Sequence, residues 1–353
     1  MYLQDCRTLT EQPIFFERNR VYRITQGGLL FHRFFGDEAK DTNYPEEWVA
    51  SSVPATLNKG RDPREGISVI KGTHIGFDEL LRAEPARMLG DRKELGVLLK
   101  VLDGSMRLPV QVHPSKSFSQ KYLGSQYGKA EAWLILATRG DAAIRFGFSE
   151  KIDKKTFMQA IERDETQSGT LDDLMLKIPV MPGDIFFIPA GAVHAIGADI
   201  MLLEIQEPTD FTITPETWCG GHQIDNRLKY LGLSQDIALQ CFDYNIYGKE
   251  AERLCRRFPR RIENNEHYTS EKLIDCEDTP CFAMNRHRVR GTFPLKNAPA
   301  IWIVAEGTGT LSNDSQKWAL HRGNYFFLPY ALAGQCVLKG NGELELIECL
   351  PPR

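Results

Sequence analysis

The sequence predicts an all-β fold with helical insertions, arranged as a double jelly roll. Apolar or alternating runs of strand length recur between residues 97 and 206 and again from 281 to 350. Glycine and proline separate these runs, as is typical of β-sandwiches and related folds. Helical spacing of apolar residues occurs at 77–98, where Pro85 interrupts it, and at 153–176.

Shorter segments predict local features around these elements. Residues 29–35 (LLFHRFF) are expected to be extended and to follow a turn at Gly27 and Gly28. Asp153 is the expected N-cap of the second helical segment. The polar stretch 243–275 is the expected linker.

A faint internal repeat predicts two related units. Residues 182–196 (PGDIFFIPAGAVHAI) resemble residues 322–336 (RGNYFFLPYALAGQC): each has a glycine turn, a hydrophobic strand, a proline and a second turn. Chance similarity between two such short stretches is the alternative. The repeat favours one unit at 1–240, with N-terminal strands and helical insertions, and a second, degenerate unit at 241–353.

Composition restricts the class of protein. The 353 residues carry a net charge of -4, which argues against a nucleic-acid partner because phosphate binding normally needs a basic surface. No stretch approaches the roughly 20 apolar residues that span a bilayer, and the N-terminus has no apolar core of signal-peptide length. The eight scattered cysteines form no CxxC pair and are expected to be free thiols. These features predict a cytoplasmic protein with no membrane partner; its oligomeric state stays open.

Two polar residues interrupt a predicted strand in a regular way. Gln111 and His113 are two positions apart, so both side chains lie on one face of the strand. One face of a jelly-roll strand looks into the interior, where both side chains can reach an ion. Pro114 then ends the strand.

A second motif contains another histidine. Gly183, Pro189, Gly191 and His194 follow the spacing G-x5-P-x-G-x2-H, in which the glycines permit tight turns and the proline stiffens the approach to the histidine. The spacing resembles the second signature of the cupin superfamily. Ala198 stands where that signature usually has asparagine.

The first cupin signature is altered to Gln-Val-His, with a candidate glutamate, Glu131, 18 positions after His113. Four runs in the chain resemble the type I phosphomannose isomerases: LLKVLDGSMRLPVQVHP, YGKAEAWLIL, PGDIFFIPAGAVHAIG and LLEIQ. The resemblance is good over 97–147 and 180–210 and weaker elsewhere. It implies a metal-dependent isomerase that interconverts mannose 6-phosphate and fructose 6-phosphate through an enediol.

The same resemblance implies four ligands for one zinc ion: Gln111, His113, Glu131 and His194. Two imidazoles, a carboxylate and an amide oxygen suit a borderline dication such as Zn²⁺. The alternative is that His113 and His194 are core histidines without a metal. The remaining histidines have no comparable context and are expected to be surface or structural residues: His32, His74, His222, His267, His287 and His321.

The resemblance also implies residues around the sugar. Glu204 is expected to orient the ligand or a metal-bound water, and Asp210 to take part in proton transfer. Lys100 and Lys129 match lysines near the sugar-phosphate site. The alternative for Glu204 and Asp210 is a turn cap or a surface salt bridge, and for Lys100 and Lys129 a solvated position on the surface.

Two positions depart from the family pattern. Pro109 replaces a serine before the Gln-x-His run, and Thr214 replaces an arginine four residues after Asp210. In the family that arginine is associated with the substrate and the proton transfer, so its absence implies weakened activity, a different substrate, or a substitute cation, for which Arg227 or an arginine from elsewhere is the candidate. The departure leaves three alternatives open: an isomerase of a different, unphosphorylated sugar; a catalytically silent sugar-binding homologue; and another metal cupin, such as an iron dioxygenase.

Overall fold

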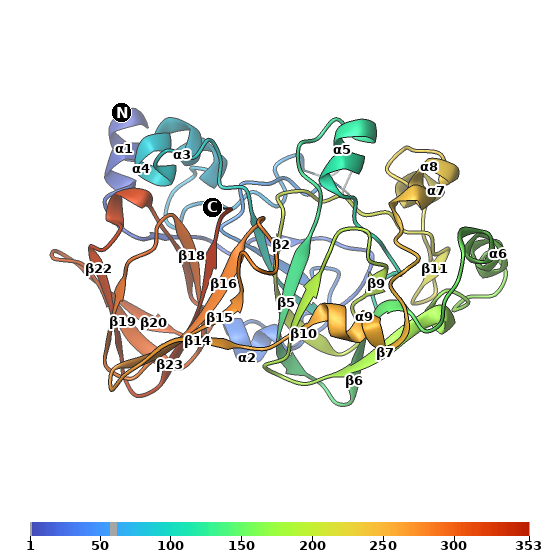
Figure 1. The fold of residues 1–353 in the computed structure, drawn as a ribbon. Helices are drawn as coiled ribbons and strands as arrows, with labels where there is room; N and C mark the ends of the chain where they lie inside the picture. The colour runs from blue at the N-terminus through green and yellow to red at the C-terminus, as the bar shows by residue number, and fades with distance from the viewer. Residues whose placement is uncertain (1, 57–61, 353) are drawn as a thin grey trace.

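Two β-rich units lie side by side in the computed structural model, which describes residues 2–56 and 62–352 (Figure 1). The first unit is mostly green and the second orange to red, and helices gather around their edges. The predicted fold class, mostly β with helical insertions and a double jelly roll, is confirmed.

Each unit contains one large antiparallel sheet. Within the described residues, the sheet of the first unit has seven strands in the order β13 (Arg256–Arg257), β8 (Ile185–Ile188), β5 (Glu131–Thr138), β10 (Ile200–Gln206), β4 (Leu98–Gly104), β3 (Glu46–Val49) and β2 (Arg20–Val21). The sheet of the second unit has the order β1 (Ile14–Phe15), β21 (Tyr325–Leu328), β18 (Ala300–Glu306), β23 (Leu344–Leu350), β16 (Ala283–Val289), β15 (Tyr268–Ile274) and β14 (Arg260–Asn264).

The two sheets match strand for strand, which gives the internal repeat a structural meaning. β8 and β21, the strands inside the repeated sequences, take the same place. One outermost strand of each sheet comes from across the predicted boundary: β1 pairs with β21, and β13 pairs with β8. Two short strands therefore tie the units together, and the boundary at residue 240 stays a prediction.

Smaller sheets complete the two sandwiches. The first unit adds β7 (Met175–Val180), β6 (Ala142–Phe148) and β9 (His194–Ala195). The second adds β17 (Thr292–Leu295), β22 (Cys336–Gly340), β19 (Thr308–Ser312) and β20 (Lys317–His321). A small hairpin is formed by β11 (Trp218–Cys219) and β12 (His222–Gln223).

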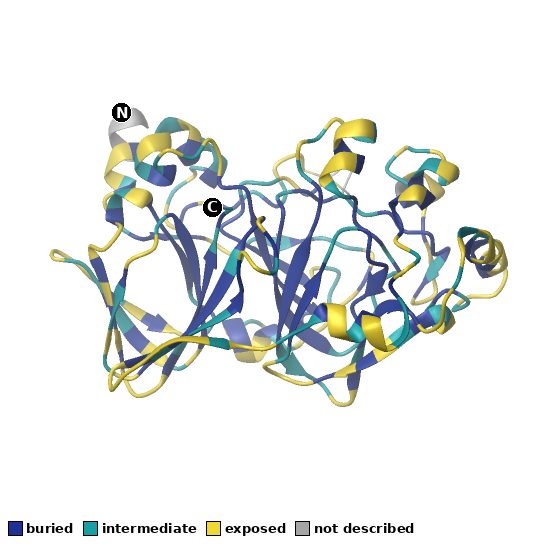
Figure 2. Cartoon of the chain, viewed as in Figure 1, coloured by how far each residue is buried: buried dark blue, intermediate teal, exposed yellow. Residues whose placement is uncertain are grey.

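The central strands of the large sheets are buried on both faces, which explains why strands such as β10 and β18 are apolar almost throughout. Along β10, Leu203 and Ile205 join a core shared with residues of the second unit, such as Ile303. Leu202 points the other way, into the interior of the first sandwich. Glu204 follows the same alternation and therefore faces that interior. Most residues of the central strands are buried in Figure 2.

Helices cover the ends of the sheets: α1 (Tyr2–Leu9), α2 (Phe31–Phe35), α3 (Phe77–Ala83), α4 (Pro85–Leu89), α5 (Lys116–Tyr122), α6 (Lys154–Asp164), α7 (Asn226–Lys229), α8 (Gln235–Ala238) and α9 (Gly248–Cys255), with 3-10 turns η1 (Asp172–Leu174), η2 (Leu239–Cys241) and η3 (Tyr330–Leu332). The break at Pro85 and the N-cap are confirmed, since the Asp153 side chain accepts a bond from the Thr156 N–H.

Two local predictions are wrong. Residues 31–35 form helix α2 instead of a strand, because Phe31, Phe34 and Phe35 recur at helical spacing and bury one face. The stretch 243–275 is not a linker, because it forms α9, β13, β14 and β15. Its polar residues occupy the exposed face of α9 and an edge hairpin, where burial is one-sided.

No helix in the described parts of the chain is both long and apolar enough to cross a membrane. The eight cysteines, all within those parts, are free, as predicted.

Candidate functional site

A pocket of about 310 Å³ opens beside the interior of the first sandwich. Its volume falls at the lower end of the range of about 300–1,000 Å³ that small-molecule sites occupy. Strands β4, β5 and β10 form one wall, and the segments before β3 and after β10 form the rim. Charged side chains line it: Arg23, Glu46, Lys100, Lys129, Glu131, Glu204 and Asp210.

Three buried side chains converge at one side of this pocket. The ligand atoms of His113, Glu131 and His194 all lie within 4.8 Å of one another. The Nε2 atom of His113 is 3.2 Å from one oxygen of Glu131, and the Nε2 atom of His194 is 3.3 Å from the other. A carboxylate held between two imidazoles is an arrangement that can bind a metal ion.

Hydrogen bonds to the far side of each ring aim both imidazoles inward. The Nδ1 atom of His113 lies 2.8 Å from the Phe211 carbonyl, and that of His194 lies 2.9 Å from the Ala192 carbonyl. Each Nδ1 must donate to its carbonyl, which leaves the Nε2 lone pair toward Glu131. The Nε2 atom of His194 is buried and has no hydrogen-bond partner among the described residues.

The electrostatics keep this group competent to bind a metal. Burial and the nearby Lys129 ammonium lower the pKa of His113 to about 3, so the ring is neutral at physiological pH. Although burial acts to raise the pKa of Glu131, Lys129 and the imidazoles lower it well below its usual range. A neutral imidazole and an ionised carboxylate are the forms that ligate metals.

Gln111 is placed beside the trio by the backbone. Its N–H donates to the His194 carbonyl and its carbonyl accepts from the His194 N–H, each at 2.9 Å. Residues that exchange both bonds in an antiparallel pair direct their side chains to the same face. Gln111 also lines the pocket, so its amide lies within the same site as Glu131.

The turn glycines bring the two histidine segments together. Gly183 and Gly191 both have positive φ, at 95° and 88°, which only glycine adopts easily. The Gly191 N–H donates to the His113 carbonyl at 2.9 Å. In the second unit, Ala300 begins β18 at the place where Glu131 begins β5.

Comparison with known proteins agrees with this geometry. A sequence model of the family described as "Mannose-6-phosphate isomerase, cupin domain" matches residues 271–348. The chain is 28% identical to a mannose-6-phosphate isomerase of Streptococcus mutans over 343 residues, which cover 95% of this chain and 97% of the relative. It is also 28% identical to the mannose-6-phosphate isomerase ManA of Bacillus subtilis, over 95% and 98% of the two chains.

The chain is thus similar to mannose-6-phosphate isomerases over almost its whole length, and the cupin-domain model of that family matches part of its second unit. The crystal structure of the mannose 6-phosphate isomerase from Bacillus subtilis has the same fold, with a TM-score of 0.75 at 22% identity, covering 95% of this chain and 99% of that one. A putative mannosephosphate isomerase from Archaeoglobus fulgidus gives a TM-score of 0.72 at 19% identity, over 97% and 98%.

The predicted sugar-side residues line the same pocket as Glu131. The Lys100 ammonium is 3.4 Å from the Glu204 carboxylate, across neighbouring strands. Burial and the nearby Glu131 raise the pKa of Glu204, while Lys100 opposes that change. The Lys129 ammonium lies 2.8 Å from His113 Nε2 and 3.0 Å from Glu131. The catalytic and binding roles of these residues stay predictions.

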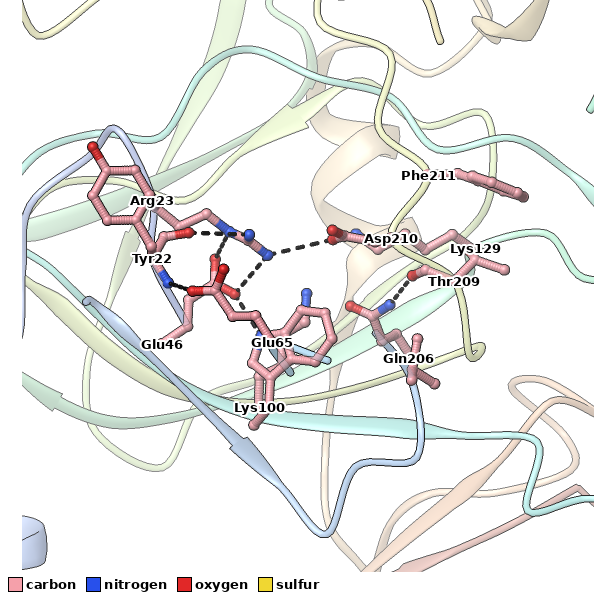
Figure 3. Close-up of polar contacts among 12 residues, drawn as sticks. Tyr22, Arg23, Glu46, Glu65, Lys100, Lys129, Gln206, Thr209, Asp210 and Phe211 are labelled. Atoms are coloured by element: carbon pink, nitrogen blue, oxygen red, sulfur yellow. Dashed lines mark hydrogen bonds and ion pairs between the residues drawn. The ribbon is translucent and has the colours of Figure 1, made fainter. Parts of the chain in front are cut away.

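Asp210 is held at the pocket rim by a braced loop (Figure 3). The Gln206 amide donates to the carbonyls of Glu207 and Thr209. The Thr209 hydroxyl donates to the Gly128 carbonyl at 2.8 Å, three residues before Glu131. The loop that carries Asp210 is therefore fixed to the strand that carries a metal-binding side chain.

Two pocket residues, Arg23 and Glu46, were missed from the sequence, where they looked like ordinary charged residues near edge strands. The predicted substitute, Arg227, does not line the pocket: its side chain is 88% exposed and pairs with Asp225. Thr214 and Pro109 do line the pocket, so both departures from the family pattern face the site.

Proposed function

We propose that the protein is a metal-dependent aldose–ketose isomerase that interconverts mannose 6-phosphate and fructose 6-phosphate. One observation carries the proposal: the buried trio of His113, Glu131 and His194 reaches, through Glu131, a pocket lined by paired acids and bases. Relatives that align over 95% of the chain carry the matching name.

We assign Zn²⁺ to the site, held by Gln111, His113, Glu131 and His194. The donor set fits it, because two neutral imidazole nitrogens and oxygen donors suit Zn²⁺, and His194 offers a buried, unpartnered Nε2. When bound, the metal supplies Lewis acidity that polarises the carbonyl and hydroxyl oxygens of the sugar.

The charge of the pocket favours an anionic substrate. Three cations and four carboxylates line it, so the group carries about one negative charge without a metal and one positive charge with a divalent ion. A sugar phosphate is attracted to such a site.

Proton transfer falls to the chain's own carboxylates. Isomerisation moves a proton between C1 and C2 of the sugar, and Asp210 is the carboxylate that the loop presents to the pocket. Glu204, held by Lys100, is placed to orient the sugar hydroxyls. Lys100 and Lys129 supply the charge that contacts the anionic substrate.

Metal analysis combined with a panel of sugars tests the proposal. Wild-type protein is expected to contain zinc, to convert mannose 6-phosphate, and to exchange the C2 hydrogen with solvent deuterium. Asp210→Asn is expected to lose the exchange and keep the metal. Metal-loaded protein that leaves mannose 6-phosphate unchanged would refute the substrate assignment.

A second candidate is an isomerase of an unphosphorylated sugar. Thr214 favours it, because this pocket residue provides no charge where the resemblance implies an arginine. Faster conversion of mannose than of mannose 6-phosphate in the same panel would select this candidate.

A further inference from the structure

Arg23 brings a buried guanidinium into the sugar pocket from the far end of the chain. It follows β2 by two residues, and its backbone is fixed on both sides: its N–H donates to the Asn43 carbonyl, and the Asn43 amide donates to the Arg23 carbonyl. The side chain is only 12% exposed. Such a rigid placement means that the guanidinium has little freedom to leave the pocket.

The guanidinium joins two acids that come from different elements (Figure 3). Its Nε and Nη2 atoms donate to the two oxygens of Glu46 at 2.8 and 3.0 Å, a bidentate pair. The same Nη2 atom lies 3.4 Å from Asp210 Oδ1. The Trp48 indole also donates to Glu46 at 2.8 Å, so the carboxylate that orients Arg23 is itself held.

The loop of Asp210 has no cation of its own. Residues 209–216 read TDFTITPE, without a lysine or arginine, and Arg227 points to solvent. A carboxylate that transfers protons must keep a fixed direction, and a 1 Å displacement can cost about 100-fold in rate. Arg23 is placed to fix that direction from across the pocket.

We propose that Arg23 is a positioning residue for Asp210 and that Glu46 orients Arg23 for this task. The cation beside Asp210 is then Arg23, which lies near the N-terminus, and not a residue of the loop that carries Asp210. The inference rests on the proposed isomerase function, because the role of Asp210 in proton transfer belongs to that proposal.

Arg23→Lys tests the proposal, because lysine keeps the charge but cannot make a bidentate pair with Glu46 and reach Asp210 as well. The kcat on mannose 6-phosphate is expected to fall by about 100-fold, with KM changed by less than about threefold. Zinc content and Tm are expected to match the wild type. In Arg23→Ala, guanidinium at non-denaturing concentration is expected to restore part of the lost kcat.

Arg20→Lys and Arg20→Ala are matched controls. Arg20 lies in β2, is 18% exposed and pairs with Glu47 and Asp37, but it does not line the sugar pocket. These variants are expected to keep kcat and to gain nothing from guanidinium.

Three outcomes would overturn the inference. An active wild type with an equally active Arg23→Lys variant would refute the positioning role alone and leave the isomerase function intact. Loss of kcat in proportion to loss of Tm, without rescue by guanidinium, would show a purely structural role. A metal-loaded wild type that is inactive on mannose 6-phosphate would refute the proposed function and the inference together.

Discussion

Gln111 and His194 exchange two backbone hydrogen bonds of 2.9 Å each and direct their side chains to one face. Neither residue belongs to a long strand, since Gln111 forms only an isolated bridge and β9 has two residues. The metal-binding geometry thus depends on a short backbone pairing that the turn at Gly191 holds in place.

His194→Ala is expected to remove zinc from the purified protein, because it deletes a buried donor that no other described side chain replaces. Metal analysis by mass spectrometry measures the change. His222→Ala, which alters an exposed histidine of β12, is the control and is expected to keep full metal content. Full occupancy in His194→Ala would contradict the assignment of this residue as a ligand.

Much of the site could be predicted from the sequence, because spacing carries information where a side chain must face one side. The period of two across Gln111 and His113 and the glycine turns before His194 indicated residues that the structure brings together at one site: the two histidines converge on Glu131, and Gln111 and Glu131 line the same pocket. Strand β5 was found because most of its apolar run is buried on both faces, and β6 because its buried apolar residues alternate over the first half of the strand.

Arg23, Glu46 and the edge strands could not be predicted in the same way. Arg23 and Asp210 meet only because the chain passes through the whole first unit between them, and no local pattern records that meeting. Helix α2 was mistaken for a strand because five residues with three phenylalanines fit either period. The pairing of β1 with β21 is likewise a property of the complete fold.

Lys129→Met is expected to tighten zinc binding by about tenfold or more, because it removes a positive charge next to the metal-binding atoms. The Lys129 ammonium lies within 3.0 Å of both His113 and Glu131. Competition with a zinc chelator measures the affinity. Lys116→Met is the control, since Lys116 pairs with Glu207 outside the trio. Weaker zinc binding in Lys129→Met would show instead that the ammonium holds the ligands in place.

A fragment of residues 241–353 is expected to aggregate, because it lacks the strand that covers β21. Ile14 pairs with Phe327 and Phe15 with Phe326, so their removal leaves β21 as an exposed, apolar edge. Size-exclusion chromatography measures the state of the fragment. Addition of a peptide that spans β1 is expected to restore a monomer, whereas a fragment that is monomeric alone would show that the predicted boundary at 240 suffices.

As the pH falls, the Glu46→Gln variant is expected to lose less of its free energy of unfolding than the wild type. Burial acts to raise the pKa of Glu46, but Arg23 and Lys100 lower it from 4.5 to about 2. Since the folded pKa lies below the unfolded value, ionised Glu46 stabilises the fold above about pH 4.5, and this contribution is lost as the pH falls toward 2. This lowering of the pKa of Glu46 corresponds to a contribution on the order of 3 kcal/mol to the free energy of unfolding.

Urea denaturation of wild type and Glu46→Gln measures this contribution directly. At neutral pH the variant is expected to be less stable, and the difference between the two proteins is expected to shrink as the pH falls through the window set by 4.5 and about 2. Glu38→Gln is the control, because Glu38 is an exposed partner of Lys40 and is expected to leave the curve unchanged. A constant difference between wild type and Glu46→Gln at all pH values would mean that packing, not the charge held by Arg23, sets the contribution of Glu46.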